Sequence, residues 1–309
     1  MTLVLAVTSP KSIWMMTDKR LSYADPTMNR DDAHKTMVLE TPDGAALLGY
    51  AGLGATRNGM EPSEWMVNVL RGRNLSMEDS LKTLGAAIRQ EFPPHVGSKW
   101  IPGHYVVTAG FVNGSPQVYT MGIEGTPEGG YRFQMARQVV MHSGREYSVR
   151  TVVSGSGASV LAKRPKGAWY RNILRAVNQF NAGTIKAETA AKAFAQVNLS
   201  VSQQVSSVGP ACEVHWRLPP GGGAGQVFDG IEPRRESVKD MAELATKIPE
   251  TMIPTSAQGT DLKAFLKVVL PDLMQRLKTV KAGVPYKTDE EAINRELAKL
   301  KTDPDDKLR

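Results

Sequence analysis

Thr2 is the first residue whose chemistry stands out, because an apolar run that begins at Leu3 follows it directly. A threonine at a free N-terminus carries a nucleophilic hydroxyl and an α-amino group. The ordinary pKa of that amino group, about 7.7–8, suits a base that activates the hydroxyl. Such a nucleophile needs a fixed position for attack, and a buried strand directly after it would provide one. Removal of Met1 before this small residue would expose Thr2 without a propeptide. The alternative is that Thr2 is an ordinary second residue.

Five further positions carry residue types that could assist such a nucleophile. Asp18 ends the second predicted strand, in TDKRLS, and Lys35 follows in HKTMVLE. Gly52 and Gly54 stand in GYAGLGA, and Ser156 stands between two glycines in GSGA. Each also has a plainer explanation. Asp18 could be a turn residue that closes the second strand, and Lys35 could be one of many solvated lysines. The glycines could be needed for the backbone shape at a strand end, and Ser156 could be a helix N-cap.

In this order and at these spacings, the six features resemble the proteasome β-subunit family of N-terminal nucleophile hydrolases. The bacterial peptidase HslV and other bacterial proteasome homologues are the nearest class. The resemblance covers about residues 2–230 and does not extend to the C-terminal part of the chain. It implies a reaction in which an amide is hydrolysed through an acyl-enzyme ester on Thr2.

The resemblance implies a role for each catalytic position. Thr2 is expected to be both nucleophile and base. Lys35 would lie beside it as a positive charge that lowers the pKa of its neighbours, and Asp18 would be the buried partner that keeps Lys35 charged. Gly52 is expected to donate its backbone N–H to the oxyanion, and Ser156 to hydrogen-bond near the α-amino group.

The same resemblance implies a pocket for the substrate side chain and a supporting shell. Leu21, Tyr50 and Gly54 are expected near the pocket, although Tyr50 is bulky for such a position and would narrow it. Arg20, in the Asp-x-Arg sequence after the second strand, belongs to the supporting residues. A surface ion pair of little energetic value is the alternative for Arg20.

One stretch departs from the family pattern. Many members carry Asp-x-x-Ser-Gly between the fourth helix and the next strand, where this chain has SQQVSSVGPACEV. The best match puts Gln204 in place of the aspartate, Ser207 in place of the serine and Val208 in place of the glycine. A shift of one residue would choose Ser206 instead. Fold and activity therefore have to be judged separately.

The hydrophobic pattern predicts an α+β fold, in which two antiparallel sheets are covered by helices on both outer faces as a four-layer αββα sandwich. A capped helix is predicted from Ser76 with Asp79 three residues later, and a hairpin turn is predicted at Asn113-Gly114. Strands are predicted at 2–9, 12–17, 36–40, 44–51, 104–112, 116–123, near 131–140 and 148–154, at 211–217 and at 226–228, and further helical stretches at 156–163, 169–180 and 187–197.

The composition changes after about residue 231, which divides the chain into a hydrolase-like domain at 1–230 and a helical extension at 231–309. The extension contains two amphipathic patterns, the first interrupted at Pro271. Thr288 and Glu291 predict a capping box for the second. We expect the extension to serve assembly or partner contact, because nothing in it resembles a catalytic site.

Bulk properties exclude several classes of protein. Of the 309 residues, 41% are hydrophobic and 22% charged, which is enough for a buried core and excludes global disorder. The net charge of +7 is scattered, which favours a solvated surface over nucleic-acid binding. The only cysteine, Cys212, excludes a disulfide framework within the chain, and the histidines show no metal-ligand spacing. We expect no cofactor, no metal and no membrane span, and a cytoplasmic location.

The leading hypothesis is a threonine-type peptidase subunit of a self-compartmentalising particle. By resemblance, its partners are other copies of the chain in stacked rings, a polypeptide substrate and, less directly, an ATP-driven AAA+ unfoldase. Two alternatives remain open: a latent or inactive assembly protein with the same fold, and a small-molecule amidase of the same superfamily.

Overall fold

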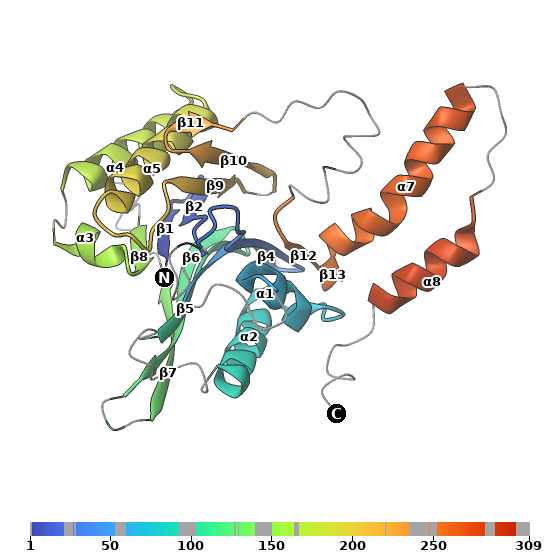
Figure 1. Ribbon diagram of the computed structural model, residues 1–309, viewed down its shortest axis with the longest axis horizontal. Coiled ribbons are helices and arrows are strands. Elements are labelled where there is room, and N and C mark those ends of the chain that lie inside the picture. The colour runs from blue at the N-terminus through green and yellow to red at the C-terminus, as the bar shows by residue number, and fades with distance from the viewer. Residues whose placement is uncertain are drawn as a thin grey trace.

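The computed structural model describes residues 2–21, 27, 29–52, 60–92, 103–126, 128, 130–139, 150–163, 167–219, 221–234, 247, 252–281 and 288–300. Within these residues the strands form two β-sheets, and helices cover the outer face of each sheet (Figure 1). The expectation of a mixed α+β fold with two sheets is confirmed.

The first sheet has the strand order β11-β10-β9-β2-β1-β8, and every pairing in it is antiparallel. Helix α3 follows β8, and α4 and α5 pack over the sheet. The bounds are β1 Leu3–Thr8, β2 Ile13–Asp18, β8 Arg150–Gly155, α3 Ala158–Ala162, α4 Ala168–Asn181, α5 Ala187–Ser202, β9 Ala211–Arg217, β10 Gly223–Asp229 and β11 Glu232–Pro233.

The second sheet has the order β13-β12-β3-β4-β5-β6-β7, and it is antiparallel except where β12 pairs in parallel with β3. Helices α1 and α2 pack over its outer face. The bounds are β3 Thr36–Thr41, β4 Gly44–Ala51, α1 Pro62–Leu70, α2 Met77–Glu91, β5 Gly103–Val112, β6 Ser115–Gly125, β7 Tyr131–Val139, β12 Thr255–Ala257 and β13 Thr260–Asp261.

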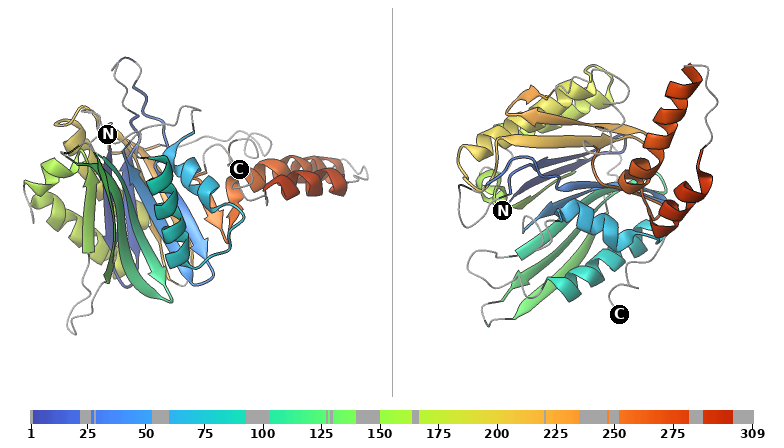
Figure 2. Two further views of the ribbon diagram at one scale, coloured as in Figure 1. Left: turned by 90° about the horizontal axis from the view of Figure 1, so that it is seen from below. Right: turned by 45° about the vertical axis from the view of Figure 1, so that its right-hand side comes forward.

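Figure 2 shows how the layers are arranged. Three apolar clusters hold these layers together. One joins the first sheet to α4 and α5 around Trp14, whose ring stacks on Phe194 with 5.5 Å between centroids. A second joins the second sheet to α1 and α2, and a third lies between the two sheets. Alternate residues of β1 face different clusters, with Leu3 toward the helices and Val4 toward the other sheet. Burial on both faces explains why β1 is an uninterrupted apolar run.

Two local predictions, the hairpin turn and the capped helix, are confirmed. Asn113 and Gly114 have φ angles of 49° and 75°, which is the geometry of a tight hairpin turn between β5 and β6. The Ser76 side chain caps α2 by accepting a hydrogen bond from the Asp79 N–H at 3.2 Å.

Two elements differ from the sequence predictions. Helix α1 was not predicted, and it begins with Pro62 in the first turn, a position that tolerates proline. Strand β10 begins at Gly223, three residues before the predicted Gln226. The glycines hid this strand because a Cβ at Gly223 or Gly225 would collide with the neighbouring β9. Glycine here allows the strands to approach closely.

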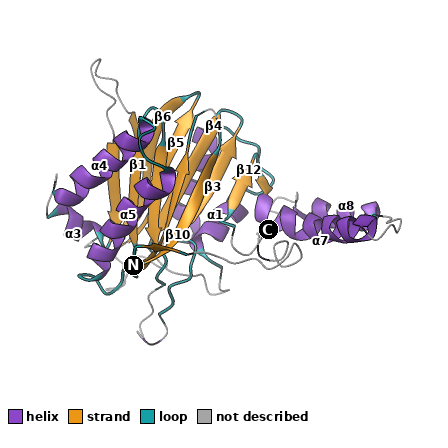
Figure 3. Cartoon of the chain, turned by 90° about the horizontal axis from the view of Figure 1, so that it is seen from above, coloured by secondary structure: helices purple, strands orange, loops and turns teal. Residues whose placement is uncertain are grey.

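In its described residues, the C-terminal extension has three short strands that the sequence analysis did not predict: β11 on the first sheet, and β12 and β13 on the second. A pair of helices follows, α7 Leu262–Lys281 and α8 Glu290–Leu300. The two helices lie side by side and project from the body (Figures 1 and 3). Helix α7 continues through Pro271, and the predicted capping box is wrong by one residue. Asp289 caps α8 by accepting from the Ala292 N–H, while the Thr288 hydroxyl bonds Asp272 on α7.

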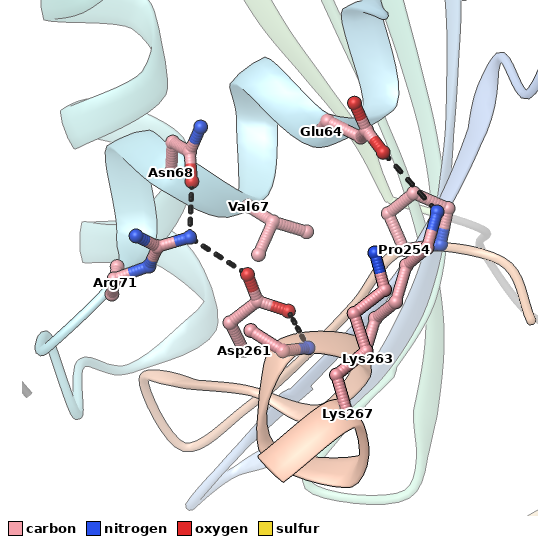
Figure 4. A pocket seen from close by; sticks show the side chains of 9 residues that line it. Glu64, Val67, Asn68, Arg71, Pro254, Asp261, Lys263 and Lys267 are labelled. Carbon is pink, nitrogen blue, oxygen red and sulfur yellow. Dashed lines mark hydrogen bonds and ion pairs between the residues drawn. The ribbon is translucent and has the colours of Figure 1, made fainter. Parts of the chain in front are cut away.

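Two ion pairs fasten the extension to the second sheet's helical layer (Figure 4). Arg71, just after α1, lies 2.8 Å from Asp261 on β13. Lys263 at the start of α7 lies 3.1 Å from Glu64 on α1. These pairs fix the beginning of α7, whereas α8 contains no buried residue.

None of the described helices is long and apolar enough to cross a membrane.

Candidate functional site

Asp18 is the centre of a buried hydrogen-bond network at the end of β2. Its Oδ1 accepts from the Leu3 N–H at 2.8 Å and from Lys35 Nζ at 3.1 Å. Its Oδ2 accepts from the N–H groups of Arg20 and Gly209, each at 3.1 Å. Asp18 is fully buried, so these four donors replace the water that a carboxylate normally requires. The plainer explanation of Asp18 as a turn residue does not account for this arrangement.

Lys35 lies just before β3 on the second sheet, and its ammonium crosses to the first sheet. Besides Asp18, it donates to the Arg20 carbonyl at 2.5 Å, and its side chain is 2% exposed. Burial lowers the pKa of Lys35, and the charge of Asp18 offsets part of that effect. Lys35 is therefore not a solvated lysine, and its proton is held less tightly than that of a surface lysine.

Thr2 is almost completely buried and its backbone is fixed by β8 and the turn that follows. Its carbonyl accepts from the Gly157 N–H at 3.4 Å and from Ser156 Oγ at 3.5 Å. Gly155, paired with Leu3, has φ +89°, and a Cβ there would lie 2.0 Å from the Thr2 carbonyl oxygen. Only glycine permits this close approach, so the sequence GSG is a specific support for Thr2.

The end of β4 reaches the same place from the second sheet. A Cβ built on Gly155 would lie 3.2 Å from Ala51 Cβ, so the residue before Gly52 lies close to the Thr2 carbonyl. Gly52 has φ +155°, and a Cβ there would lie 2.7 Å from the His104 ring. Glycine is thus required at position 52 by its surroundings, and Gly52 follows directly on Ala51.

Ser156 and Ser207 form a hydroxyl pair, with 2.9 Å between their Oγ atoms. Ser156 is not a helix cap, because α3 begins after Gly157. Of the two serines that the sequence left open, Ser207 supplies this hydroxyl, while Ser206 offers its carbonyl to Arg20 at 3.0 Å.

Gln204 is not part of the network. Its side chain is exposed and bonds back to a carbonyl of α5 at 2.9 Å. Val208, at the position where the family pattern has glycine, is buried in the cluster beneath α4 and α5.

Arg20 makes a two-pronged ion pair with Asp31, with Nε–Oδ1 at 2.8 Å and Nη2–Oδ2 at 2.7 Å. This hydrogen-bonded pair raises the pKa of Arg20. A Cβ at Gly209 would lie 2.4 Å from Asp31 Oδ1, so the ion pair packs directly on the Gly209 backbone. The Asn198 side chain in turn holds the Gly209 carbonyl at 2.9 Å. Arg20 is therefore more than an isolated surface ion pair, because it connects the residues around Asp18.

The three residues predicted for substrate binding have different positions. Leu21 is buried and pairs through its backbone with Arg30, directly after the Arg20 carbonyl that binds Lys35. The Tyr50 ring is not brought into the network: it packs beneath α1 and α2, and its hydroxyl lies 2.5 Å from His104 Nδ1. Gly54 lies outside the described residues.

Sequence reasoning missed several supporting residues. Gly209 stands one position later than the glycine of the family pattern, so its N–H contact with Asp18 was not predicted. Asn198, whose side chain holds the Gly209 carbonyl, was not predicted to be part of the site. Glu213, in the middle of β9, is fully buried beside Lys35. A carboxylate between apolar residues in ACEVHW was the available signal for Glu213.

The described residues contain no group of histidine, cysteine and carboxylate side chains placed to hold a metal ion. What they do provide is the buried backbone of Thr2, the Lys35 ammonium with its lowered pKa and the fixed carboxylate of Asp18. Such groups suit nucleophilic attack on an acyl carbon.

No protein-family model matches the chain, and no curated protein matches it. Among solved structures, it is similar to Anbu (ancestral beta-subunit) from Yersinia bercovieri, with a TM-score of 0.42 and 13% identity over 93% of this chain and 99% of that one. It is also similar to Anbu from Hyphomicrobium sp. strain MC1 (TM-score 0.40, 13% identity, 93% and 99% covered). The Anbu (Gly-1) mutant from the same strain has a TM-score of 0.39 and 13% identity over 93% of this chain and 100% of that one. Similarity at this level carries no argument about activity, which has to come from the site.

Proposed function

We propose that this protein is an amide hydrolase of the threonine-peptidase type, with a four-layer N-terminal nucleophile hydrolase fold and Thr2 as its nucleophile. Removal of Met1 would free the α-amino group of Thr2, which then acts as the base. The substrate class is a peptide or polypeptide amide, and the products are an acid and an amine.

One observation carries the proposal. Asp18 Oδ1 accepts hydrogen bonds both from the N–H of Leu3, the residue bonded to Thr2, and from Lys35 Nζ. A single carboxylate oxygen thus ties the backbone at Thr2 to a buried ammonium. An ammonium in that position would lower the pKa of the Thr2 amino and hydroxyl groups, which favours proton transfer at neutral pH.

The proposed reaction has two halves. The Thr2 hydroxyl attacks the substrate carbonyl and its proton passes to the α-amino group, while the N–H of Gly52 stabilises the oxyanion. The α-amino group then gives the proton to the leaving amine, and an ester remains on Thr2. Water, deprotonated by the same amino group, hydrolyses the ester and restores the free hydroxyl. Lys35 stays charged throughout and is held by Asp18.

The test combines the mass of the mature N-terminus with hydrolysis of a fluorogenic peptide. We expect Met1 to be absent, Thr2→Ala to be inactive and Thr2→Ser, which keeps a hydroxyl, to retain activity. Retained Met1, or activity of Thr2→Ala equal to that of the wild type, would refute the proposal.

A second candidate is an assembly protein without turnover, which the exposed position of Gln204 favours, because the family pattern has an aspartate in the supporting shell there. An epoxyketone probe, which reacts with the hydroxyl and amine of an N-terminal threonine, separates the two. Labelling of Thr2 would support the hydrolase, and an unlabelled but intact protein would support the assembly protein.

We also propose that the protein associates with copies of itself through the pair of helices α7 and α8. Leu273 and Leu277 on α7 are 44% and 42% exposed and stand four residues apart, so they share one face of the helix, which a second copy of the chain could cover. Native mass measurement of the full chain, with Leu273→Ser/Leu277→Ser as the variant, tests this. A wild-type monomer would contradict it, and would favour a small-molecule amidase over a chambered peptidase.

A further inference from the structure

Strand β9 presents a row of polar side chains to the space between the sheets. Cys212, Val214 and Trp216 belong to the cluster beneath α4 and α5. Because side chains alternate along a strand, Glu213 and His215 face the opposite way, toward the second sheet. Glu213 is fully buried there, and a buried carboxylate is costly unless it is hydrogen-bonded.

One oxygen of Glu213 holds the backbone that carries Lys35. Glu213 Oε1 accepts from the N–H of Lys35 at 3.1 Å and from the N–H of Thr36 at 3.0 Å. It also accepts from the Thr17 hydroxyl at 3.1 Å, and that hydroxyl lies 3.0 Å from the Thr36 hydroxyl. A side chain of the first sheet therefore fixes the first residues of β3 in the second sheet.

The rest of the short segment His34–Thr36 is fixed as well. The His34 N–H donates to Glu61 at 2.8 Å, and its carbonyl accepts from the Ser63 hydroxyl at 2.6 Å. The Lys35 carbonyl accepts from the Tyr50 N–H at 3.0 Å. The N–H groups of Lys35 and Thr36 are the ones that Glu213 binds. Glu213 also carries a negative charge that acts on the Lys35 ammonium.

The second oxygen of Glu213 faces positive or protonatable groups. His34 Nδ1 lies 2.9 Å from Oε2, His215 Nε2 at 3.6 Å and Lys19 Nζ at 4.0 Å. Burial by itself raises the pKa of Glu213, but His34, His215 and Lys19 outweigh it and hold that pKa well below its usual range. A Cβ at Gly225 would lie 2.0 Å from the His215 ring, so glycine on β10 leaves room for this histidine.

We propose that Glu213 is a positioning residue for Lys35: its carboxylate fixes the backbone at Lys35 and its negative charge favours the charged ammonium that the reaction uses. Glu213 acts through Lys35 and does not touch the substrate. The inference rests on the proposed function, and it assigns to β9 a part in the reaction that the family resemblance does not include.

The variant Glu213→Gln separates positioning by charge from a purely structural role. The glutamine oxygen can still accept from the N–H groups of Lys35 and Thr36, and its NH₂ can donate to Nδ1 of a neutral His34. Shape and hydrogen bonds are thus kept while the charge is lost. Glu40→Gln is the matched control, since Glu40 on β3 pairs with Arg217 of the same polar row and has no contact with Lys35.

Two measurements are made on the full-length protein after thermal melting has shown that each variant is folded. The first is the pH profile of kcat and KM for a fluorogenic peptide. The second is the pKa of Lys35 by NMR of ¹³C-labelled lysine, which does not require activity. The charged or titratable neighbours that contribute to these profiles are Asp18, Lys19, Asp31, His34 and His215.

We expect Glu213→Gln to lower kcat by about tenfold or more with KM little changed, because loss of the negative charge leaves less of Lys35 in the charged form, and each unit by which its pKa falls is tenfold in that equilibrium. The pKa of Lys35 falls further, so the loss of activity on the alkaline side begins at lower pH than in the wild type. Glu40→Gln leaves both unchanged.

A folded Glu213→Gln protein with the wild-type kcat profile and the wild-type Lys35 pKa would overturn the inference. If the wild type itself shows no Thr2-dependent hydrolysis, the proposed function fails. The NMR titration alone then decides whether Glu213 controls Lys35.

Discussion

The space between the two sheets has an apolar part and a polar part, and they are built in different ways. Between β1, β2, β4 and β5 it is filled by apolar side chains that include Val4, Met15 and Leu47. At the end of β2, the start of β3 and the middle of β9, the same space holds Lys35 and Glu213. The two parts lie within one pair of sheets, so the difference comes from the side chains alone.

The comparison separates stability from chemistry. Apolar packing is non-directional, so the apolar part can adapt to small changes without losing its function of holding the sheets together. Each polar group in the other part depends on a particular partner, because a buried donor or acceptor without one is costly. Burial of ionic groups is weak evidence for stability. The polar part is therefore better explained by the positions it enforces on Thr2 and Lys35.

The largest effect is expected from Lys35→Met, which removes the ammonium and leaves Asp18 buried without it. Activity should fall by about 10²–10⁴-fold, the usual range for loss of a group that assists proton transfer. The free energy of unfolding should fall by about 3–5 kcal/mol, because one partner of a buried pair is lost. Peptide hydrolysis and urea unfolding measure the two effects.

Lys263→Met is the control for Lys35→Met. It removes a lysine from a partly exposed ion pair with Glu64 on α1, which is not among the residues that contact Asp18. It should change stability by no more than about 1 kcal/mol, as for partly exposed pairs. If both variants behave alike, the comparison between the two parts of the molecule is wrong.

Gly155→Ala tests how strictly Thr2 is positioned. The added Cβ would lie 2.0 Å from the Thr2 carbonyl oxygen, so the backbone at Thr2 has to move. We expect a loss of kcat on the order of 10²-fold, since catalysis is sensitive to displacements of about 1 Å.

Gly183→Ala is the matched control, because Gly183 also has positive φ, at +72°, but a Cβ there has no neighbour within 4 Å. It carries the backbone strain without the collision, and should lose about 1 kcal/mol of stability and no activity. Equal losses of activity in both alanine variants would show that strain alone is responsible.

Leu47→Ala tests the apolar part. Leu47 is 1% exposed and lies between the sheets, so its truncation should lower the free energy of unfolding by about 2–5 kcal/mol. Activity measured well below the melting temperature should stay within about twofold of the wild type, because the polar contacts are untouched. A loss of activity as large as that of Gly155→Ala would mean that the two parts are not separable.

The difference between the apolar part and the polar part also explains which features of the structure the sequence could predict. Alternation and apolar runs predicted β1, β2, β4 and β9, because burial of side chains follows a simple period. Thr2, Asp18, Lys35 and Ser156 were predicted together only through the order of a family pattern, and the structure brings these four into one network.

The contacts that the sequence could not predict join residues far apart in the chain. Glu213 holds Lys35, and Gly209 holds Asp18, across 178 and 191 positions. No local period carries such information. The Tyr50 side chain was placed near the pocket by resemblance, whereas its alternation on β4 turns it toward α1 and α2. Strands β12 and β13 were missed because they are only two or three residues long.

The smallest effect is a pH dependence of stability that comes from Glu213. Its pKa is lower in the folded protein than the usual 4.5, so its contribution to stability is complete above about pH 4.5 and is lost as the pH falls toward the folded-state value. The wild type should therefore lose up to about 1.4 kcal/mol per pH unit from this group on the acid side. Glu213→Gln lacks this contribution. Urea unfolding between pH 3.5 and 5.5 should give converging free energies for the two proteins as the pH falls, and parallel curves would show that Glu213 is not held in its charged form by the residues around it.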